Sequence, residues 1–420
     1  MAINLKLTLL KSLAIVSCAI LPWNATAVNH GSMTDLLLTQ KFGKSLVESL
    51  LVKSLLEITQ GNTKQAFATV NELIRTAPNF KLAYLIRGDL LNAQARPIEA
   101  LGNTNTTTSK SNDEVIQGLR DEARTRIDYY LSDKKNNQLP NLLIKLTDEQ
   151  THVIVVDTVK SRLYLYKNVE GGLQYAADYY VTIGKNGAGK QAQGDKRTPL
   201  CVYFVGKKLT QPLADMYGDG AYPLNYPNEL DQHQNKNGSG IWLHGTPTNT
   251  YSRPPRASDG CVVLSNPDLN ALAPILQTGK VPVIISDSIE WLDKEKSDFQ
   301  SEEQKTLTET IDEWRKDWVA QNTDKYLSHY STQFFYDDGR YQKWADYKRS
   351  IQAAKPKVSI HINDISMFSY PNIKENAQEN MVVVNFEQDF KSPTLQNKMR
   401  KRQYWINENN QWKIIYEGAA

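Results

Sequence analysis

One cysteine and one histidine in the middle of the chain have the types and the setting of a thiol nucleophile and its base. His244 ends an apolar run, and Cys261 follows Gly260 and begins the apolar run 262–264. A thiol attacks an acyl carbon well only as a thiolate, and an imidazole within hydrogen-bond reach can take its proton and later return it to the leaving amine. At such a turn the N–H groups of Gly260 and Cys261 can face an oxyanion. A carbonyl at Gly245 is a natural acceptor for the second ring nitrogen of His244.

Each residue also has a plainer interpretation. A cysteine followed by valines is more often a small buried hydrophobe, and a histidine after a leucine is more often a structural residue. Removal of an N-terminal leader with Cys18 would leave Cys201 and Cys261. An exported chain with so few cysteines is not a disulfide scaffold, so either these two pair or one is kept for its reactivity. A disulfide between them would disable the nucleophile.

Strands on both sides must position the two residues. Apolar or alternating segments that predict strands occur at 152–157, 162–166, 179–183, 201–205 and 281–286. A stretch rich in Pro, Gly, Asn and Tyr, 209–258, lies between the last two of them. Loops this long in a compact domain are usually functional. Arg253 and Arg256 near its end could meet a substrate carboxylate, although solvated loop arginines are the alternative.

The spacing of these residues resembles the motif of the L,D-transpeptidase catalytic domain of bacterial cell-wall enzymes. That motif places a His-Gly or His-Ser pair before Ser/Thr-His-Gly-Cys and an apolar residue. Here His244-Gly245 precedes Ser258-Asp259-Gly260-Cys261, and the histidine lies 17 positions before the cysteine. Segment 194–203, with its Thr-Pro pair, resembles the family's glycine-flanked Thr-Pro strand, and 221–228 resembles the substrate-side loop of its murein-peptide branch.

The resemblance implies a two-step acyl transfer that needs no metal and no cofactor. The residues expected to carry the chemistry are Cys261 as nucleophile, His244 as base, Gly245 as the backbone carbonyl that orients His244, and Gly260 as an oxyanion N–H. Substrate contacts are expected from Ser258, Asp259, Arg256, Tyr222 and Tyr226. Two positions depart from the family: Asp259 replaces the second histidine, which is not the base, and Cys201 replaces a usual glycine. Asp259 should alter the handling of substrate or acceptor, and we expect Cys201 to be a buried strand residue.

The implied substrate is the stem peptide of peptidoglycan. Cys261 would attack the carbonyl of the third stem residue and expel D-alanine, after which the acyl group passes to an amine or to water. The first outcome is L,D-transpeptidation and the second is L,D-carboxypeptidation. Two other functions stay open: a hydrolase that releases a protein or a cross-link from the third stem residue, and a catalytically silent periplasmic scaffold.

The first 27 residues have the order of a secretory signal peptide. Lys6 and Lys11 precede the apolar run 12–21, and Ala25-Thr26-Ala27 offers small residues for cleavage. The apolar run is shorter than the ~20 residues that a membrane span needs. We therefore predict export and a periplasmic location. The 420 residues have a formal net charge of +3 and no pronounced basic run, which argues against a nucleic-acid partner.

Residues 28–148 are expected to form a helical, tetratricopeptide-like region. Helical spacing covers 36–56, 64–76 and 81–92, whereas 103–112 is rich in Thr, Ser and Asn and predicts a linker. A single repeat-like unit cannot bury its face alone. It must pack on neighbouring helices, on another domain or on a second copy of the chain, so a homodimer through this region is one expectation.

After a catalytic domain at 149–290, residues 303–420 read as a helix followed by a curved sheet. This part resembles the nuclear-transport-factor-2-like cone. Its expected core aromatics are Trp314, Trp318, Tyr326, Tyr330 and Phe334. Cell-wall carboxypeptidases of curved bacteria share this combination of parts, and the implied role of the cone is substrate placement or dimer support. The expected fold is thus multidomain: an α-helical N-terminal region, a mainly β L,D-transpeptidase catalytic domain and an α+β cone-like C-terminal domain.

Overall fold

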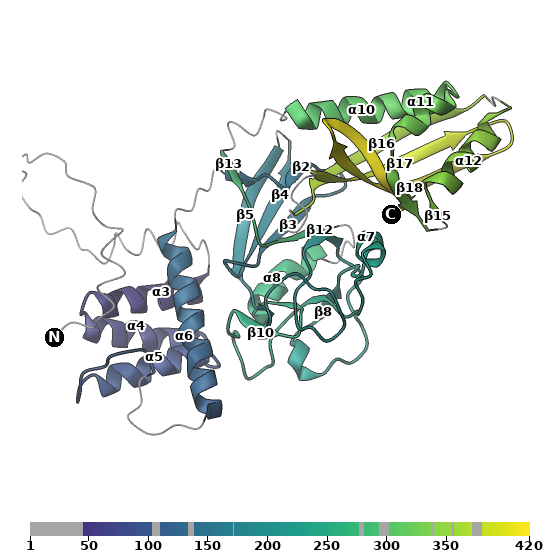
Figure 1. The fold of residues 1–420 in the computed structure, drawn as a ribbon. Helices are drawn as coiled ribbons and strands as arrows, with labels where there is room; N and C mark the ends of the chain where they lie inside the picture. Colours follow the sequence, from purple (N-terminus) through teal and green to yellow (C-terminus); the bar gives the residue numbers. More distant parts are fainter. Residues whose placement is uncertain are drawn as a thin grey trace, which may run out of the picture.

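The computed structural model describes residues 45–102, 110–132, 138–170, 172–276, 281–293, 302–337, 339–354, 357–371 and 380–420. The predicted signal peptide lies outside the described residues. Three modules follow one another along the chain: a helical layer, a mainly β catalytic module and an α+β module (Figure 1). This architecture confirms the fold class expected from the sequence.

The N-terminal module contains α3 (Leu46–Thr59), α4 (Thr63–Thr76), α5 (Lys81–Asn92) and α6 (Lys110–Leu131). The third helix has the bounds that helical spacing predicted, and the second begins one residue earlier than predicted and ends where expected. The predicted linker at 103–112 was wrong at its end, because 110–112 form the first turn of α6. In Figure 1, α6 stands beside the α3–α5 layer on the side that faces the catalytic module.

The helices bury their apolar faces against one another. Leu51, Val70, Leu73 and Phe80 are fully or almost fully buried, and Ala123 of α6 joins the same cluster. The half-buried Tyr251 of the catalytic module also packs against this cluster. The repeat-like unit therefore packs on a neighbouring helix and on another domain within one chain.

The catalytic module is built around a five-stranded sheet with the order β5-β4-β3-β12-β7. Its strands are β3 (His152–Asp157), β4 (Arg162–Val169), β5 (Gly172–Tyr180), β7 (Cys201–Phe204) and β12 (Pro282–Ser286). β3 and β12 run parallel at its centre, and their apolar runs are buried on both faces, as central parallel strands require.

Shorter strands and helices surround this sheet and form the region of the site. A second sheet has the order β11-β9-β8, with β8 (Ala221–Pro223), β9 (Trp242–His244) and β11 (Val262–Val263). A parallel pair joins β6 (Ile183–Gly184) to β10 (Arg256–Ser258). The helices of this module are η1 (Asp215–Tyr217), α7 (Glu229–His233) and α8 (Asn266–Leu276). The stretch predicted as a long loop thus supplies three strands of the site as well as connections.

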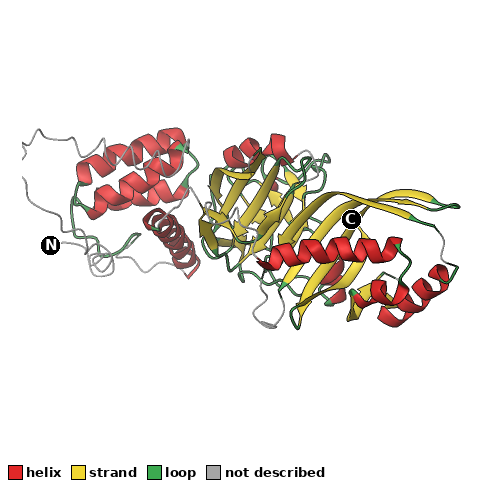
Figure 2. Ribbon diagram, turned by 90° about the horizontal axis from the view of Figure 1, so that it is seen from above, coloured by secondary structure: helices red, strands yellow, loops and turns green. Residues whose placement is uncertain are grey.

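The C-terminal module is a seven-stranded sheet with helices against it. The sheet order is β15-β14-β19-β18-β17-β16-β2. Its own strands are β14 (Tyr330–Tyr336), β15 (Gly339–Arg340), β16 (Ser359–Ser369), β17 (Met381–Lys391), β18 (Gln396–Glu408) and β19 (Gln411–Ala419). The helices α10 (Glu302–Val319), α11 (Thr323–Ser328) and α12 (Tyr341–Gln352) complete it, and α10 lies across the sheet (Figure 2). The turn at Asn409-Asn410 has both residues at positive φ, as a type I′ hairpin requires.

The segment before the catalytic sheet supplies a strand to the C-terminal sheet. The seventh strand, β2 (Leu143–Lys145), comes from the segment before the catalytic sheet and pairs antiparallel with β16. The nearby β1 (Gln138–Pro140) pairs instead with β13 (Trp291–Asp293). Residues 138–145 therefore connect to both modules rather than to the helical region alone.

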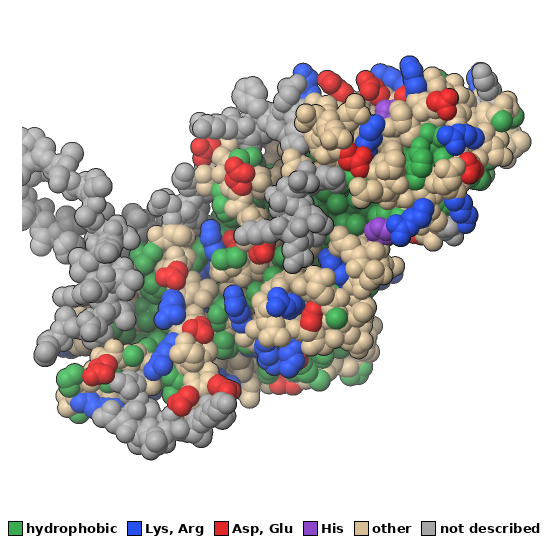
Figure 3. Space-filling view, viewed as in Figure 1, with side chains coloured by type: hydrophobic (Ala, Val, Ile, Leu, Met, Phe, Trp, Pro, Cys, Tyr) green, Lys and Arg blue, Asp and Glu red, His purple; other side chains and the backbone are tan. Residues whose placement is uncertain are grey.

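The surface carries both signs of charge. On the face shown in Figure 3, basic and acidic side chains are interspersed over the modules, consistent with a formal net charge of +3. Across the part of the chain that the structure describes, none of the helices combines the length and the apolar character needed to cross a bilayer.

Candidate active site

Parallel pairing of two short strands brings His244 and Cys261 to the same place. His244 ends β9, and Cys261 comes directly before β11, where Val262 pairs with Leu243 and Val263 with His244. Extending this register by one residue places Cys261 beside Trp242. Because side chains alternate along a strand, Cys261 and His244 lie on the same face, two positions apart.

A ring cluster marks this face of the small sheet. The Tyr217 ring packs against Trp242 at 4.9 Å and against His244 edge-on at 5.1 Å between centroids. The Sγ atom of Cys261 lies 3.2 Å from the carbonyl oxygen of Gly240, to which it donates. His244 is 2% exposed, whereas Cys261 is only partly buried. The thiol is therefore the member of the pair that a substrate can reach.

The tautomer of His244 follows from its hydrogen bond. Nδ1 lies 2.7 Å from the carbonyl oxygen of Gly245, and a carbonyl can only accept. Nδ1 therefore carries the proton, and Nε2 of the neutral ring has a lone pair available. Burial lowers the pKa of His244 to about 4, against the opposing effect of the Gly245 carbonyl. The imidazole is neutral near pH 7, as a proton acceptor must be.

The thiol is also neutral before substrate arrives. Burial raises the pKa of Cys261 to about 11; Asp259 raises it further, while Arg253 and Lys190 lower it. A neutral thiol beside a neutral imidazole indicates that proton transfer accompanies the attack on a substrate rather than preceding it.

Gly245 must be glycine for a steric reason. A Cβ on Gly245 would lie 2.0 Å from Oδ1 of Asn266. That oxygen accepts the N–H groups of Asp219 (3.1 Å) and Thr246 (3.2 Å), and the same side chain donates to the Thr246 carbonyl (2.9 Å). Asn266, at the start of α8, thereby fixes Thr246, the residue that follows the Gly245 carbonyl. That carbonyl is the group that orients His244.

Two hydroxyl side chains, those of Ser258 and Thr198, shape the turn before Cys261. Ser258 Oγ donates to the carbonyl of Cys261 at 2.7 Å and accepts the N–H of Gly260 at 3.1 Å. The fully buried Thr198 donates to the carbonyl of Gly260 at 3.0 Å and accepts the N–H of Gly184 at 2.9 Å. The Thr-Pro strand therefore holds the nucleophile turn in place.

These contacts correct two predictions. The N–H of Gly260 already has an acceptor in Ser258, so it is not the oxyanion donor that the sequence suggested. Ser258 is itself 3% exposed and its hydroxyl is engaged within the turn, so it shapes the turn rather than contacting substrate. Among the described residues, none accepts a hydrogen bond from the N–H of Cys261. That N–H is the backbone donor left to face an oxyanion.

The other expected substrate contacts divide into exposed and buried residues. Asp259 is exposed and forms an exposed ion pair with Lys185 at 3.3 Å, and Arg256 is exposed at the start of β10. Tyr222 is fully buried and Tyr226 is 6% exposed. Both tyrosines belong to the main hydrophobic core, so the expectation that they contact substrate is corrected. Their rings pack in the hydrophobic core of the catalytic module.

Arg253 was named together with Arg256 as a residue that could meet a substrate carboxylate. It acts electrostatically on both Cys261 and Asp259. Its guanidinium donates to the carbonyl of Met216 at 2.9 Å. Its position depends on the fold of 246–256, for which the sequence offers only two arginines flanking a Pro-Pro pair.

Cys201 is a free, buried thiol in β7 and is not linked to Cys261. The amide nitrogen of Asn228 lies 3.0 Å from its Sγ, and burial raises its pKa to about 12. This agrees with the expectation of a buried strand residue. Of the two described cysteines, Cys261 is the accessible one.

Comparison with known families agrees with this geometry. Residues 151–285 match the YkuD family, the L,D-transpeptidase catalytic domain. The chain carries an L,D-transpeptidase catalytic domain. Residues 306–418 match the Cds6 C-terminal NTF2-like domain. The family suspected from the sequence is therefore confirmed for both parts, and the L,D-transpeptidase domain contains both His244 and Cys261.

Two solved structures resemble the chain over about two thirds of its length. A variant of the helical cell shape determining protein Pgp2 from Campylobacter jejuni is 27% identical with a TM-score of 0.56, over 69% of this chain and 97% of that one. Bd1075 from Bdellovibrio bacteriovorus is 27% identical with a TM-score of 0.57, over 67% and 98%. No curated protein sequence matches the chain.

The NTF2-like domain buries the aromatic residues expected of it. The buried core includes all five: Trp314, Trp318, Tyr326, Tyr330 and Phe334. The Trp314 ring nitrogen donates to the hydroxyl of Tyr330, which in turn donates to Glu417 at 2.8 Å. These side chains lie in the C-terminal module, outside the L,D-transpeptidase domain.

Proposed function

We propose that the chain is an exported peptidoglycan enzyme that cleaves the bond between the third stem-peptide residue and D-alanine through a thioester on Cys261. The observation that carries the proposal is the hydrogen bond from Nδ1 of His244 to the Gly245 carbonyl. It leaves Nε2 as the acceptor on the face that Cys261 shares. The match to the L,D-transpeptidase catalytic domain supports peptidoglycan as the substrate.

The proposed first step forms an S–C bond, breaks the C–N bond to D-alanine and transfers one proton through His244. As Sγ of Cys261 bonds to the carbonyl carbon of the third residue, Nε2 of His244 takes the thiol proton. The N–H of Cys261 faces the oxyanion that forms. When the tetrahedral intermediate collapses, the C–N bond breaks, and the proton on Nε2 passes to the leaving amine of D-alanine. The product is a thioester between Cys261 and the shortened stem.

For the second step we propose water as the acceptor, which makes the enzyme an L,D-carboxypeptidase. Nε2 of His244 would take a proton from water as its oxygen attacks the thioester, and would return it to Sγ. Two observations support trimming over cross-linking. An exposed carboxylate, Asp259, stands beside the nucleophile in place of the motif's histidine, and the matching structures include a protein named for helical cell shape.

The decisive experiment is incubation of purified protein with tetrapeptide muropeptides, followed by mass analysis. Tripeptide alone supports the carboxypeptidase, whereas new dimers or D-amino-acid exchange would show a transpeptidase. Release of a protein or of a cross-link from the third residue would favour the alternative hydrolase. The Cys261→Ala and His244→Gln variants should lose the reaction.

A labelling experiment addresses the scaffold alternative. A carbapenem or thiol probe should modify the wild type and Cys201→Ala equally and should fail with Cys261→Ala. Cys201 is the matched control because it is a free thiol of the same domain but fully buried. Failure to label Cys261, together with wild-type cell shape for Cys261→Ala, would make the protein a silent scaffold.

Export and self-association complete the proposal. The charged, apolar and small-residue order of 1–27 supports a cleaved signal peptide and a periplasmic location. Sequencing the N-terminus of protein recovered from the periplasm should give Val28 first. A homodimer through the N-terminal helices stays a prediction, for which sedimentation of the purified protein is the measurement.

A further inference from the structure

The segment between His244 and Cys261 is held by the N-terminal helices as well as by its own domain. Asn79, between α4 and α5, donates its side-chain amide to the Thr248 carbonyl at 3.0 Å, and its carbonyl accepts the N–H of Tyr251 at 3.1 Å. The rings of Phe80 and Tyr251 pack at 5.0 Å. These contacts join residues about 170 positions apart in the chain.

Helix α6 makes the next two contacts along the same segment. Ser252 Oγ donates to Oε1 of the buried Glu122 at 2.6 Å. Gly118, one turn earlier on α6, faces the ring of Pro254, since a Cβ on this glycine would lie 2.7 Å from Pro254 Cγ. Arg253 lies between these two contact points, so its backbone position follows that of α6.

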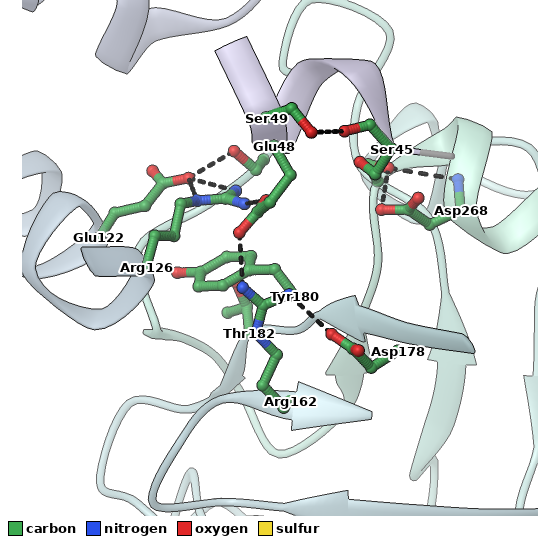
Figure 4. A network of polar contacts seen from close by, with 12 residues as sticks. Ser45, Glu48, Ser49, Glu122, Arg126, Arg162, Asp178, Tyr180, Thr182 and Asp268 are labelled. Atoms are coloured by element: carbon green, nitrogen blue, oxygen red, sulfur yellow. Dashed lines mark hydrogen bonds and ion pairs between the residues drawn. The ribbon is translucent and has the colours of Figure 1, made fainter. Parts of the chain in front are cut away.

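A buried polar cluster fixes α6 on the catalytic domain. Arg126 of α6 pairs with Glu122 (2.8 Å) and with Glu48 of α3, and Glu48 also pairs with Arg162 of β4 (2.5 Å). Arg162 in turn contacts Asp178 of β5 at 3.3 Å. Figure 4 shows the Glu48 carboxylate between the two guanidinium groups. Charges buried this deeply are costly unless paired, so the cluster favours a single docked position of the helices.

The catalytic domain holds the same backbone from the opposite side. The Tyr180 hydroxyl donates to the Arg253 carbonyl at 3.0 Å, and Thr182 Oγ1 donates to the Arg253 and Pro254 carbonyls at 3.0 and 2.9 Å. The Arg126 guanidinium stacks over the Tyr180 ring, 3.8 Å from its centroid. The Arg253 backbone is thus fixed between two modules, and its guanidinium bonds Met216, the residue before the Tyr217 ring that packs on Trp242 and His244.

The Arg253 side chain is a partly exposed cation that interacts electrostatically with Cys261. Within the described residues, no carboxylate lies within salt-bridge distance of it, and its guanidinium donates to the Met216 carbonyl. An arginine fork can bind a carboxylate through two parallel hydrogen bonds. The amino acid that leaves in the proposed reaction carries a free carboxylate next to the scissile amide, which brings that charge close to Cys261.

We propose that Arg253 binds the carboxylate of the leaving C-terminal residue, and that the N-terminal helices act as a positioning element by fixing the segment that carries it. This inference rests on the proposed function of Cys261. It makes the enzyme selective for stems that end one residue after the scissile bond, since longer stems have no free carboxylate at that place. The N-terminal module thereby contributes to substrate selection through contacts remote from the thiol.

The test compares a tetrapeptide stem with the same peptide amidated at its C-terminus. Wild type should cleave the free acid with a kcat/KM higher by roughly 10- to 100-fold, the range expected for a hydrogen-bonded charge. Arg253→Gln should cleave both peptides at the amide's rate, and Arg253→Lys should recover part of the preference. An equal kcat/KM for acid and amide in the wild type overturns the inference while leaving the proposed function intact.

The helix contribution is tested with two glycines. Gly118→Val should push Pro254 away and reduce the acid-over-amide preference, whereas Gly88→Val should keep it, because a Cβ on Gly88 of α5 meets nothing within 4 Å. Thermal unfolding confirms that both variants fold. A Gly118→Val enzyme with the full preference overturns the positioning role. Wild type that cleaves neither peptide refutes the proposed function, and this inference with it.

Discussion

The position of the His244 base depends on the absence of one methyl group at Gly245. In Gly245→Ala the new Cβ would lie 2.0 Å from Asn266 Oδ1, whereas non-bonded heavy atoms normally approach to about 3.5 Å. Relief therefore requires a shift of about 1.5 Å, shared between this backbone and Asn266. A misplacement of about 1 Å can cost ~100-fold in rate. We expect kcat/KM for D-alanine release from the tetrapeptide to fall about 100-fold, or about 2.7 kcal/mol of transition-state stabilisation.

A second variant separates this clash from a general loss of stability. Asn266→Ala removes the obstructing oxygen but also removes three hydrogen bonds, and should itself cost about 3 kcal/mol of stability at ~1 kcal/mol for each hydrogen bond. The double variant Gly245→Ala/Asn266→Ala should then be close to Asn266→Ala alone, because the clash is gone. Losses that simply multiply, or a Gly245→Ala enzyme with wild-type kcat/KM and an unchanged melting temperature, would refute the role given to Asn266.

Three further predictions follow from the burial of the site and of the module contact. The kcat/KM should stay level from about pH 5 to pH 10 and fall about tenfold for each unit below the His244 pKa of about 4, because the protonated ring cannot accept the thiol proton; an acid midpoint at 6 or above in the pH–rate profile would contradict this. Glu48→Gln leaves Arg126 and Arg162 buried without their shared carboxylate, so urea unfolding should show a loss of about 3–5 kcal/mol; a loss below 1 kcal/mol would count against the cluster as a docking device. Thr198→Val should lower kcat/KM and stability together, by about 1–3 kcal/mol for each buried group left unpaired, whereas Thr198→Ser keeps the hydroxyl and should retain both; equal losses in the two variants would show that the methyl matters instead.

The fold was largely predictable because its strong signals are local. The buried run 152–157 and the alternating run 162–166 became the paired strands β3 and β4, and helical spacing gave the bounds of α5. The His-Gly and Ser-x-Gly-Cys spacing identified the residues of the candidate site for the same reason. β11 begins directly after the motif, and its pairing with β9 is enough to bring the two residues of the motif together.

The errors concern residues whose role depends on distant partners. Tyr222 lies in a loop-like sequence, yet its pairing with Leu243 turns it into the core. The N–H of Gly260 was expected to face an oxyanion because the sequence does not show that the Ser258 hydroxyl accepts it. Likewise, nothing near Asn79 in the sequence indicates a contact with Thr248. Such contacts are set by how preformed elements dock, which hydrophobic periodicity does not encode.

The strand β2, which precedes the catalytic domain and joins the C-terminal sheet, also decides where this protein could be divided. β2 covers part of the edge of β16, and an uncovered strand edge invites pairing with other chains. A truncation at residue 302 would leave β2 without its partner, and an isolated C-terminal module would expose the edge that β2 now covers. The smallest self-contained unit that includes both sheets therefore begins before Leu143. Recombination or engineering that exchanges one module must carry this strand with it, so the two domains are expected to be inherited as a pair.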